Sequence, residues 1–394
     1  MQNSNIISKE NSSSPITGNS SDILLKLNKY PVTEIYQKFG ENNFKNPLEF
    51  DQELRYCKES NHAFLGKLLP QEFIYSPENY NTITSASQGS SVAIEHFYKY
   101  VESYLTNRNV EVFIDIGAND NLMLKKFKKS GAKLIGIDPN IISDDEEILC
   151  INDYFENVDF LKEFKSGRVF LCSHTLEHIY DPRSFMDILR KNSQKDDLYF
   201  FQFPCLDLLL KDLRFDQIHH QHIHYFSVQS FKILIEDFGF ELLDYSFDFD
   251  HYGTLRTCFR KKTSSGSVNI SDFVQIENFQ KDYDCFLKIL SGANDRIDAI
   301  RDDFYCFGAS LMLPILSYYL PSLKNSKNII DENPDKLGLS YANFDIEIVN
   351  SSAIDYLNSN FVVTAVATKL ATRGVLNKLS NLKAKNIILP LNTI

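Results

Sequence analysis

From residue 111 onward, short apolar segments alternate with segments of helical periodicity. The apolar segments are EVFIDIG, KLIGID, EILCI, RVFLCS and DLYFFQFP, and they begin at residues 111, 133, 147, 168 and 197. Such alternation is typical of a parallel sheet with helices packed on its faces. We therefore predict an α/β fold with a Rossmann-like sheet over residues 111–261. The segments ELLDYSFDFD and TLRTCFRKK are expected to close it as an antiparallel pair.

The remaining segments predict a chain of several parts. Residues 1–20 are rich in Ser and Asn, which indicates a disordered tail. Residues 21–110 are expected to be mostly helical, with a helix near its end in SVAIEHFYKYVESYL. A polar linker and a long helix are predicted over 262–302, and a second, smaller α/β domain over 303–394.

Charge and cysteine content narrow the class of protein. The net charge of −11 argues against broad binding to nucleic acid. The seven cysteines include no C-x-x-C pair, so we expect neither a zinc knuckle nor a disulfide framework. The first residues lack the apolar core of a signal peptide, and no apolar run approaches the roughly 20 residues that cross a bilayer. These features predict a soluble cytoplasmic protein without a membrane partner.

The stretch VFIDIGANDNLMLKKF predicts a strand, a tight turn and a helix, with Asp115 at the strand end and Gly117 in the turn. Asp138 follows Gly117 by 21 positions, a spacing at which an acid binds ribose hydroxyls. The turn is not G-x-G-x-x-G, which a dinucleotide pyrophosphate favours. A nucleoside without phosphate, such as S-adenosylmethionine, fits better. NAD binding and ordinary strand-end caps are the alternatives.

The segment FDQIHHQHIHYFS holds His219, His220, His222 and His224, four of the nine histidines of the chain. If the segment is extended, the last three share one face and His219 points the other way. We expect a catalytic or substrate-binding loop, because histidine is suited to proton transfer at neutral pH. A metal site and plain packing are the alternatives, and we predict no metal.

Several motifs in order resemble known enzymes. VFIDIGANDNLMLKKF, GIDPN and FLCSHTLEHIYDP are similar to the nucleotide-binding motifs of class I S-adenosylmethionine-dependent methyltransferases. FQFPCLDLLL, FDQIHHQHIHYFS, HYGTLRTCF and FYCFGASLMLPILSYYL resemble the sugar C-methyltransferase family, which methylates a ring carbon of nucleotide-linked keto-deoxysugars. The resemblance covers about residues 50–394. It implies a class I methyltransferase sheet, S-adenosylmethionine as cofactor and a C-terminal domain that grips the acceptor.

The chain departs from this family in three places. Only Cys57 remains where the family has a four-cysteine zinc module, so that module is expected to be missing. The family's Tyr-His-Glu-His motif reads His219, His220, Gln221 and His222. The lysine that usually follows the Gly-Ala turn of the second domain is absent. By resemblance, His222 is the general base, His219 replaces the tyrosine that steadies an enolate, and His220 and Gln221 support them.

The resemblance and the spacing together give a set of site residues. Those expected to bind the cofactor are Asp115, Gly117, Ala118, Asn119, Asp120, Asp138, Asp153, Ser173 and His174. Those expected to contact the acceptor are Tyr80, His224, Tyr225, Tyr252 and Arg256, the last through a diphosphate. In SHTLEH, His174 and His178 are about one helical turn apart, and structural hydrogen bonds are their simpler role.

The leading prediction is C-methylation of a nucleotide-activated keto-sugar, in the biosynthesis of a surface polysaccharide or glycan. O-methylation of a sugar or related small molecule is the first alternative, because the same histidine can deprotonate a hydroxyl. The second is a catalytically silent, cofactor-binding partner protein, because both the Tyr and the Glu of the motif are replaced. The predicted partner is a small-molecule acceptor, and no oligomeric state is predicted.

Overall fold

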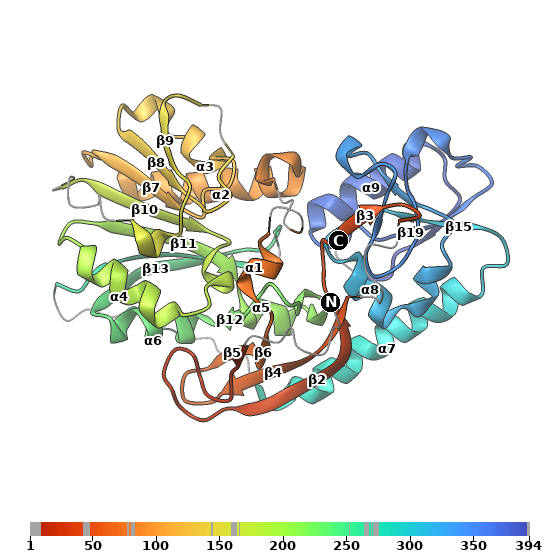
Figure 1. The fold of residues 1–394 in the computed structure, drawn as a ribbon, viewed down its shortest axis with the longest axis horizontal. Helices are drawn as coiled ribbons and strands as arrows, with labels where there is room; N and C mark the ends of the chain where they lie inside the picture. The colour runs from red at the N-terminus through yellow and green to blue at the C-terminus, as the bar shows by residue number, and fades with distance from the viewer. Residues whose placement is uncertain are drawn as a thin grey trace.

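The computed structural model of the chain describes residues 9–41, 48–76, 79, 83–142, 145–158, 164, 166–251, 253–263, 268, 270 and 276–391. Figure 1 shows two α/β bodies side by side, with the N-terminal strands β2 and β4 running along one side of the pair. Most of the predicted polar linker, together with Tyr80 and Tyr252, lies outside the described residues.

The first α/β body is built on a sheet with the strand order β13-β14-β11-β10-β7-β8-β9. Strands β11, β10, β7, β8 and β9 are parallel, and β14 runs antiparallel to its neighbours β11 and β13. The order reverses between β7 and β10, which is where ligands bind in open α/β sheets. The predicted Rossmann-like sheet and its closing antiparallel pair are confirmed. The strands are β7 Val112–Ile116, β8 Lys133–Ile137, β9 Ile148–Ile151, β10 Arg168–Ser173, β11 Leu198–Pro204, β13 Phe240–Asp248 and β14 Thr254–Lys261.

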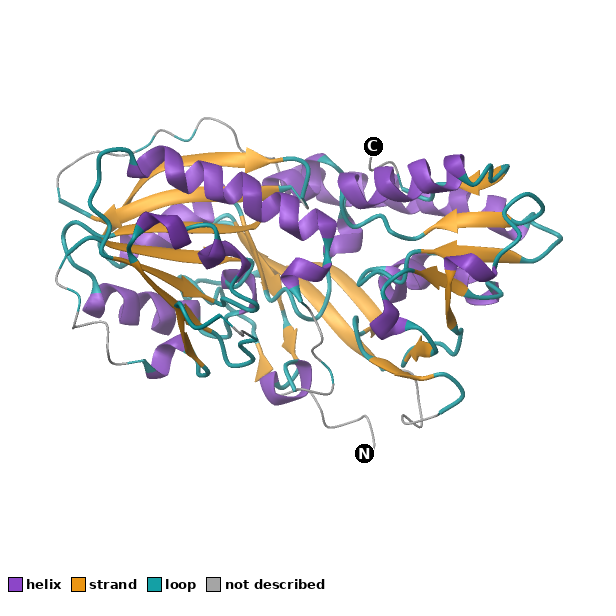
Figure 2. Ribbon diagram, turned by 90° about the horizontal axis from the view of Figure 1, so that it is seen from above, coloured by secondary structure: helices purple, strands orange, loops and turns teal. Residues whose placement is uncertain are grey.

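Helices cover both faces of this sheet, as Figure 2 shows from above. On one face, buried side chains of α4 and α6 pack on β7, β10 and β11. On the other, α2 and α3 supply Phe97, Val101 and Leu124 against Phe113 and Leu171. The predicted helix in SVAIEHFYKYVESYL is confirmed as part of α2. The helices are α2 Gln88–Leu105, α3 Leu122–Lys125, α4 Pro182–Asn192, α5 Leu206–Lys211 and α6 Val228–Asp237.

The prediction that residues 21–110 are mostly helical is wrong. As far as residue 68 the described part of this segment forms strands, and only α1 Gln71–Ile74 and α2 are α-helical. The reason is visible in EFDQELRYC, where Phe50, Gln52, Leu54 and Tyr56 are buried at every second position. That period of two belongs to a strand and not to a helix. The strands are β2 Asp22–Pro31, β3 Tyr36–Lys38, β4 Glu49–Cys57, β5 His62–Leu65 and β6 Lys67–Leu68.

The prediction of a disordered tail over 1–20 is also wrong for residues 9–20. Strand β1, Lys9–Glu10, pairs with β6, and Ile16 is completely buried in the core of the first body. A short apolar anchor within a polar stretch is enough to fix such a segment when it packs onto a larger core. Residues 1–8 lie outside the described part of the chain.

The N-terminal strands form an antiparallel sheet with the order β12-β5-β4-β2. Strand β12, His224–Phe226, comes from the histidine segment, so the N-terminal strands hold the end of that segment in register. Strand β3 pairs with β17, Leu339–Tyr341, of the C-terminal part. The N-terminal strands therefore connect the two α/β bodies.

The second α/β body has a parallel sheet with the order β18-β16-β15-β19-β20, which confirms the predicted smaller α/β domain. Its core is continuous with that of the N-terminal sheet, because Tyr30 and Leu54 belong to the same buried cluster as Phe361. In the described part of the chain, no helix has the length and apolar character needed to cross a membrane. The elements are α7 Phe279–Asp298, β15 Phe304–Phe307, α8 Leu313–Tyr319, β16 Ile329–Asp331, β18 Ile348–Asn350, β19 Asn360–Val363, α9 Lys369–Asn381 and β20 Asn386–Ile388.

Candidate active site

A cavity of about 270 Å³ lies at the carboxyl ends of β7, β8 and β10, next to the point where the strand order reverses. All nine residues predicted to bind a cofactor line it. Of the residues predicted to be catalytic, His219, Gln221 and His222 line it as well. The sheet thus brings together segments that are up to about 100 residues apart in the sequence.

The turn after β7 forms the floor of the cavity. Gly117 has a positive φ of 77°, and its N–H donates to the Ile137 carbonyl at 2.8 Å. A Cβ atom at Gly117 would lie 2.0 Å from Thr175 Oγ1, so a side chain cannot fit there. Only glycine combines this backbone conformation with this close approach. The turn is therefore packed tightly against the loop that follows β10.

Three acidic side chains surround this turn. Asp138 accepts hydrogen bonds from the N–H groups of Asn119, at 3.1 Å, and Asn140, at 2.7 Å. One carboxylate oxygen of Asp115 and one of Asp120 are buried and have no hydrogen-bond partner. Burial, followed by the nearby Asp138 and Asp120, raises the pKa of Asp115 to about 7. These buried oxygens are suited to a ligand that brings positive charge or hydrogen-bond donors.

A 3₁₀ turn at Thr84–Ala86 covers the same floor. The N–H and hydroxyl of Thr84 donate to Asn119 Oδ1 at 3.0 and 3.2 Å, and the N–H of Ser85 donates to Asp120 Oδ2 at 2.9 Å. The two polar residues of the turn after β7 thus hold the segment that precedes α2 over the cavity. The sequence contains no motif that predicts this contact.

The opposite wall comes from the loops after β9 and β10. Asp153 accepts from the Tyr154 N–H, and Ser173 Oγ accepts from Gln202 Nε2, both at 2.7 Å. His174 has a positive φ of 52°, which is uncommon for a residue other than glycine, and its Nδ1 lies 3.2 Å from Glu177 Oε1. Backbone strain of this kind often gathers at binding sites.

The histidine segment supplies the rim of the cavity. Residues 219–222 form a turn in which the His222 N–H donates to the His219 carbonyl at 3.1 Å. The two rings are 3.9 Å apart, and the His178 ring lies 5.0 Å from that of His222. Burial, followed by His219 and His178, holds the pKa of His222 well below its ordinary value. Burial likewise lowers the pKa of His219 to about 3. Both rings are therefore neutral at pH 7.

The prediction that His220, His222 and His224 share one face is wrong, because the chain turns at 219–222 and is not extended. His220 points away from the cavity, with Nδ1 3.1 Å from Gln52 Nε2 and Nε2 3.1 Å from the Tyr30 carbonyl. His224 Nε2 lies 2.8 Å from the Ile179 carbonyl, and its ring stacks on His62. Only one of these three rings, that of His222, lines the cavity.

Gln221 links the histidine turn to two other segments. Its Oε1 accepts a short hydrogen bond from Thr33 Oγ1, and its backbone carbonyl accepts from His178 Nδ1 at 2.7 Å. The structural hydrogen bond expected for His178 is thus present, but His178 also lines the cavity. Gln221 therefore positions His178 as well as standing beside His222.

Three residues predicted to contact the acceptor do not line the cavity. His224 is one, as described above. The Tyr225 hydroxyl is buried and accepts from the His219 N–H at 3.1 Å. Arg256 donates to Ser246 Oγ at 3.2 Å and to the Phe247 carbonyl at 3.0 Å. Its guanidinium group is therefore bonded within the β13–β14 pair. The remaining two, Tyr80 and Tyr252, lie outside the described residues.

Sequence reasoning missed several residues of the cavity wall. Glu34, Gln71 and Tyr75 reach it from the N-terminal segment, and Leu311 reaches it from the C-terminal domain. His251 lines it from the loop between β13 and β14. Periodicity gives no signal for residues that meet only through packing of separate parts. Two residues of this group, His251 in HYGTLR and Leu311 in FYCFGASLMLPILSYYL, lie within motifs that carry the resemblance.

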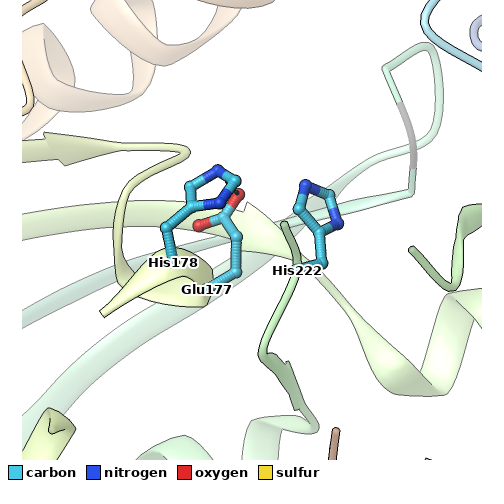
Figure 3. Close-up of side chains that lie close together, drawn as sticks. All are labelled: Glu177, His178 and His222. Carbon is cyan, nitrogen blue, oxygen red and sulfur yellow. Dashed lines mark ion pairs between the residues drawn. The ribbon is translucent and has the colours of Figure 1, made fainter. Parts of the chain in front are cut away.

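Two groups of side chains could hold a metal ion among the described residues. The ligand atoms of Glu177, His178 and His222 all lie within 4.8 Å of one another, and so do those of His96, Asp248 and Asp250. The first group is shown in Figure 3 and borders the cavity. In the second, His96 Nδ1 lies 2.8 Å from Asp248 Oδ2, and Arg256 lies 3.7 Å from the same carboxylate, so the aspartate already pairs with a cation.

Comparisons with known proteins match the first α/β body. Residues 93–245 match the family model described as a methyltransferase domain. The C-methyltransferase NovU of Streptomyces niveus is 26% identical over 169 residues, which is 40% of this chain and 40% of that protein. The chain thus spans about two fifths of the length of this curated relative. The match identifies a methyltransferase domain within the chain.

Similar solved structures cover less than half of the chain. The 1,6-didemethyltoxoflavin-N1-methyltransferase of Burkholderia thailandensis, solved with 1,6-didemethyltoxoflavin and S-adenosylhomocysteine, is 13% identical with a TM-score of 0.36 and covers 44% of this chain and 80% of its own. The PH0226 protein of Pyrococcus horikoshii OT3 is 12% identical with a TM-score of 0.38 and covers 49% of this chain and 100% of its own.

Proposed function

We propose that this chain is an S-adenosylmethionine-dependent methyltransferase whose cofactor occupies the cavity at the ends of β7, β8 and β10. The match of residues 93–245 to a methyltransferase domain supports the activity. The buried, unpartnered oxygens of Asp115 and Asp120 support a cofactor that carries positive charge and hydrogen-bond donors. Gly117 allows the turn of the cavity floor to pack against Thr175. Asp138 is the candidate for the ribose hydroxyls, by its position at the end of β8.

We propose a nucleotide-activated keto-sugar as the acceptor and carbon as the atom methylated. The observation that carries this proposal is the pair of neutral rings, His219 and His222, 3.9 Å apart at the cavity rim. The 26% identity to a protein named as a C-methyltransferase gives further support. The setting would be the biosynthesis of a surface polysaccharide or glycan in the cytoplasm.

The two histidines would divide the chemistry. His222 would take the proton from the carbon beside the ketone, which leaves an enolate and an imidazolium. A neutral His219 would donate its N–H to the enolate oxygen, the role that an oxyanion donor plays. A bound S-adenosylmethionine would supply an electrophilic methyl group on a positively charged sulfur. The methyl group would pass to the enolate carbon, with loss of its bond to sulfur, and S-adenosylhomocysteine would remain. Because the pKa of His222 lies well below its ordinary value, the base stays neutral and available at pH 7.

Solvent deuterium exchange tests the carbon chemistry. The protein is incubated with a nucleoside-diphosphate keto-deoxysugar in D₂O, and mass spectrometry follows exchange beside the ketone and methyl transfer from the cofactor. We expect exchange in the wild type and at least a ~100-fold slower exchange in His222→Ala, within the range assigned to a general base. His96→Gln is the matched control, because His96 Nδ1 lies 2.8 Å from Asp248 Oδ2 and His96 is not among the residues that line the cavity.

The other outcomes distinguish the competing functions. Methyl transfer without exchange would favour O-methylation. Cofactor binding with neither exchange nor transfer, over a panel of sugars, would favour the catalytically silent partner protein. Calorimetry with S-adenosylhomocysteine and NAD tests the cofactor itself, and binding of NAD alone would rule out the methyltransferase proposal.

A further inference from the structure

Glu177, His178 and His222 converge beside the cavity from two segments of the chain. Glu177 and His178 stand in the short turn after β10, and His222 stands in the histidine turn. Figure 3 shows the carboxylate and both rings projecting to the same side of their backbones. Their ligand atoms lie within 4.8 Å of one another. His178 and His222 line the cavity, and Glu177 is buried behind them.

Hydrogen bonds orient one of the two rings as a metal ligand. Because the Gln221 carbonyl can only accept, His178 Nδ1 must carry the proton of their 2.7 Å hydrogen bond. In the neutral form of this ring the lone pair is on Nε2, which lies 4.0 Å from Glu177 Oε1. A carbonyl that fixes the tautomer of a histidine in this way is the usual outer-shell partner of a metal-bound imidazole.

The carboxylate provides a second, independent observation. Glu177 is 1% exposed, and its Oε2 has no hydrogen-bond partner. Its Oε1 lies 3.2 Å from His174 Nδ1. Burying a carboxylate oxygen without a partner is costly unless a cation or a donor compensates. The cluster therefore contains a buried carboxylate oxygen that is suited to a cation or a hydrogen-bond donor.

We propose that Glu177, His178 and His222 bind a divalent transition-metal ion at the acceptor side of the cavity. Two imidazoles and a carboxylate form a ligand set that zinc, manganese, cobalt and iron(II) accept, with further positions left open. Donor atoms that bind one ion at about 2.1 Å lie roughly 3.4 Å apart. The ligand atoms here lie within 4.8 Å of one another, so side-chain rotations that move them by about 1 Å would close the site. The open positions face the cavity, because His178 and His222 line it.

The ligand for these open positions is an oxygen of the acceptor, and this part of the inference rests on the proposed methyltransferase function. An ion bound to a sugar hydroxyl lowers the pKa of that hydroxyl, which favours oxygen as the atom methylated. The ion also engages the lone pair of His222, so the carbon methylation proposed above belongs to the metal-free protein and oxygen methylation to the metal-bound protein. Metal binding therefore decides whether His222 acts as a base or as a metal ligand.

Cobalt(II) titration tests the site without any need for an acceptor. The full-length protein is stripped with a chelator, titrated with cobalt(II), and followed by visible absorption and calorimetry. We expect one ion per chain, with the affinity reduced at least ~10-fold in Glu177→Gln and in His222→Gln. Asp250→Asn, in the other candidate group, is the matched control and should leave the affinity unchanged.

S-adenosylhomocysteine binding, measured on every variant, separates loss of the ion site from misfolding. If the wild type binds no cobalt, or if Asp250→Asn removes the ion while Glu177→Gln does not, the proposal is overturned. A wild type that binds cobalt but not S-adenosylhomocysteine would leave the ion site standing and contradict the cofactor proposal. The two failures are therefore distinguishable.

Discussion

Gly117 and Gly131 have the same φ of 77° but different surroundings. A Cβ atom at Gly117 would collide with Thr175, whereas at Gly131 it would meet nothing within 4 Å. We predict that Gly117→Ala weakens S-adenosylhomocysteine binding by roughly 100-fold, or about 2.7 kcal/mol, because the turn must move away from the loop after β10. Isothermal titration calorimetry measures this loss.

Gly131→Ala is the matched control for this substitution. It introduces the same backbone strain, of about 1–2 kcal/mol, without the collision. We expect a lower melting temperature and an unchanged affinity for S-adenosylhomocysteine. Equal losses of affinity in the two variants would mean that backbone strain, and not the contact with Thr175, accounts for the effect.

Asp115 links the cofactor site to the pH dependence of stability. Its pKa is raised from 3.8 to about 7, so between these pH values the folded state keeps a proton that the unfolded state has lost. The cofactor-free protein therefore loses stability as the pH rises through this window, by up to about 4 kcal/mol above pH 7. We predict that Asp115→Asn stabilises the cofactor-free protein at pH 8 by roughly 2 kcal/mol more than at pH 5. Thermal unfolding at both pH values measures this difference, and an equal gain at pH 5 and pH 8 would contradict it.

At the scale of residues, sequence reasoning was better for the cavity floor than for its rim. The floor residues lie in a strand, a turn and the next strand end, so spacing along the chain determines where Asp115 and Asp138 meet. The rim depends on the local path of residues 219–222. An assumed extended path put His220 on the wrong side, because a turn reverses the alternation of faces that a strand would give.

At the scale of elements, the contribution of the α6 capping box to stability can be measured. Ser227 Oγ accepts from the Ser230 N–H at 3.0 Å and also donates to the Asn61 carbonyl at 2.8 Å. We predict that Ser227→Ala lowers the free energy of unfolding by about 2 kcal/mol, at the upper end for an N-cap, because both bonds are lost. Urea denaturation measures the change.

Ser87 at the start of α2 is the control for this element. Its Oγ accepts from the Ser90 N–H at 3.3 Å, and the residue is exposed. We expect Ser87→Ala to cost no more than ~1 kcal/mol. If the two substitutions cost the same, the bond from Ser227 to the turn before β5 contributes nothing to stability.

The N-terminal strands show where element prediction failed and why this matters for the site. Their buried positions alternate, but the alternation includes Gln52, whose amide group bonds to His220 and to the Lys67 carbonyl. A polar residue at a buried position weakens the apolar pattern that sequence reading relies on. Gln52 is buried because it holds the histidine turn. The same polar residue that weakens the strand pattern in the sequence therefore bonds to His220 in the turn at the cavity rim.

At the scale of the whole molecule, the site is closed by parts that are distant in sequence. Leu311 of the C-terminal domain and Glu34 of the N-terminal segment line the same cavity as the cofactor turn. The parallel sheets could be predicted from local alternation, but their docking could not, because it depends on side chains with no periodic signature. Arg214 is one such side chain, and it joins the two α/β bodies.

Arg214 pairs with the buried Asp216 at 2.8 Å and donates to the carbonyls of Val366, at 2.9 Å, and Ala367, at 3.3 Å. We predict that Arg214→Lys keeps a charge beside Asp216 but loses the bonds to both carbonyls, because lysine lacks the planar fork of arginine. Hydrogen exchange around Leu311 and residues 364–367 should then become faster, whereas exchange in β7 and β8 should not change.

The affinity of Arg214→Lys for S-adenosylhomocysteine is the second measurement on this variant. It should remain within about twofold of the wild type, since Asp115, Gly117 and Asp138 all belong to the first α/β body. Arg296→Lys is the control, because Arg296 is exposed and donates to Leu389 within the C-terminal part, at 3.3 Å. Faster exchange throughout the first body, together with loss of S-adenosylhomocysteine binding, would mean that Arg214 stabilises the methyltransferase domain itself. Faster exchange confined to the C-terminal side would assign Arg214 to the docking of the wall that carries Leu311.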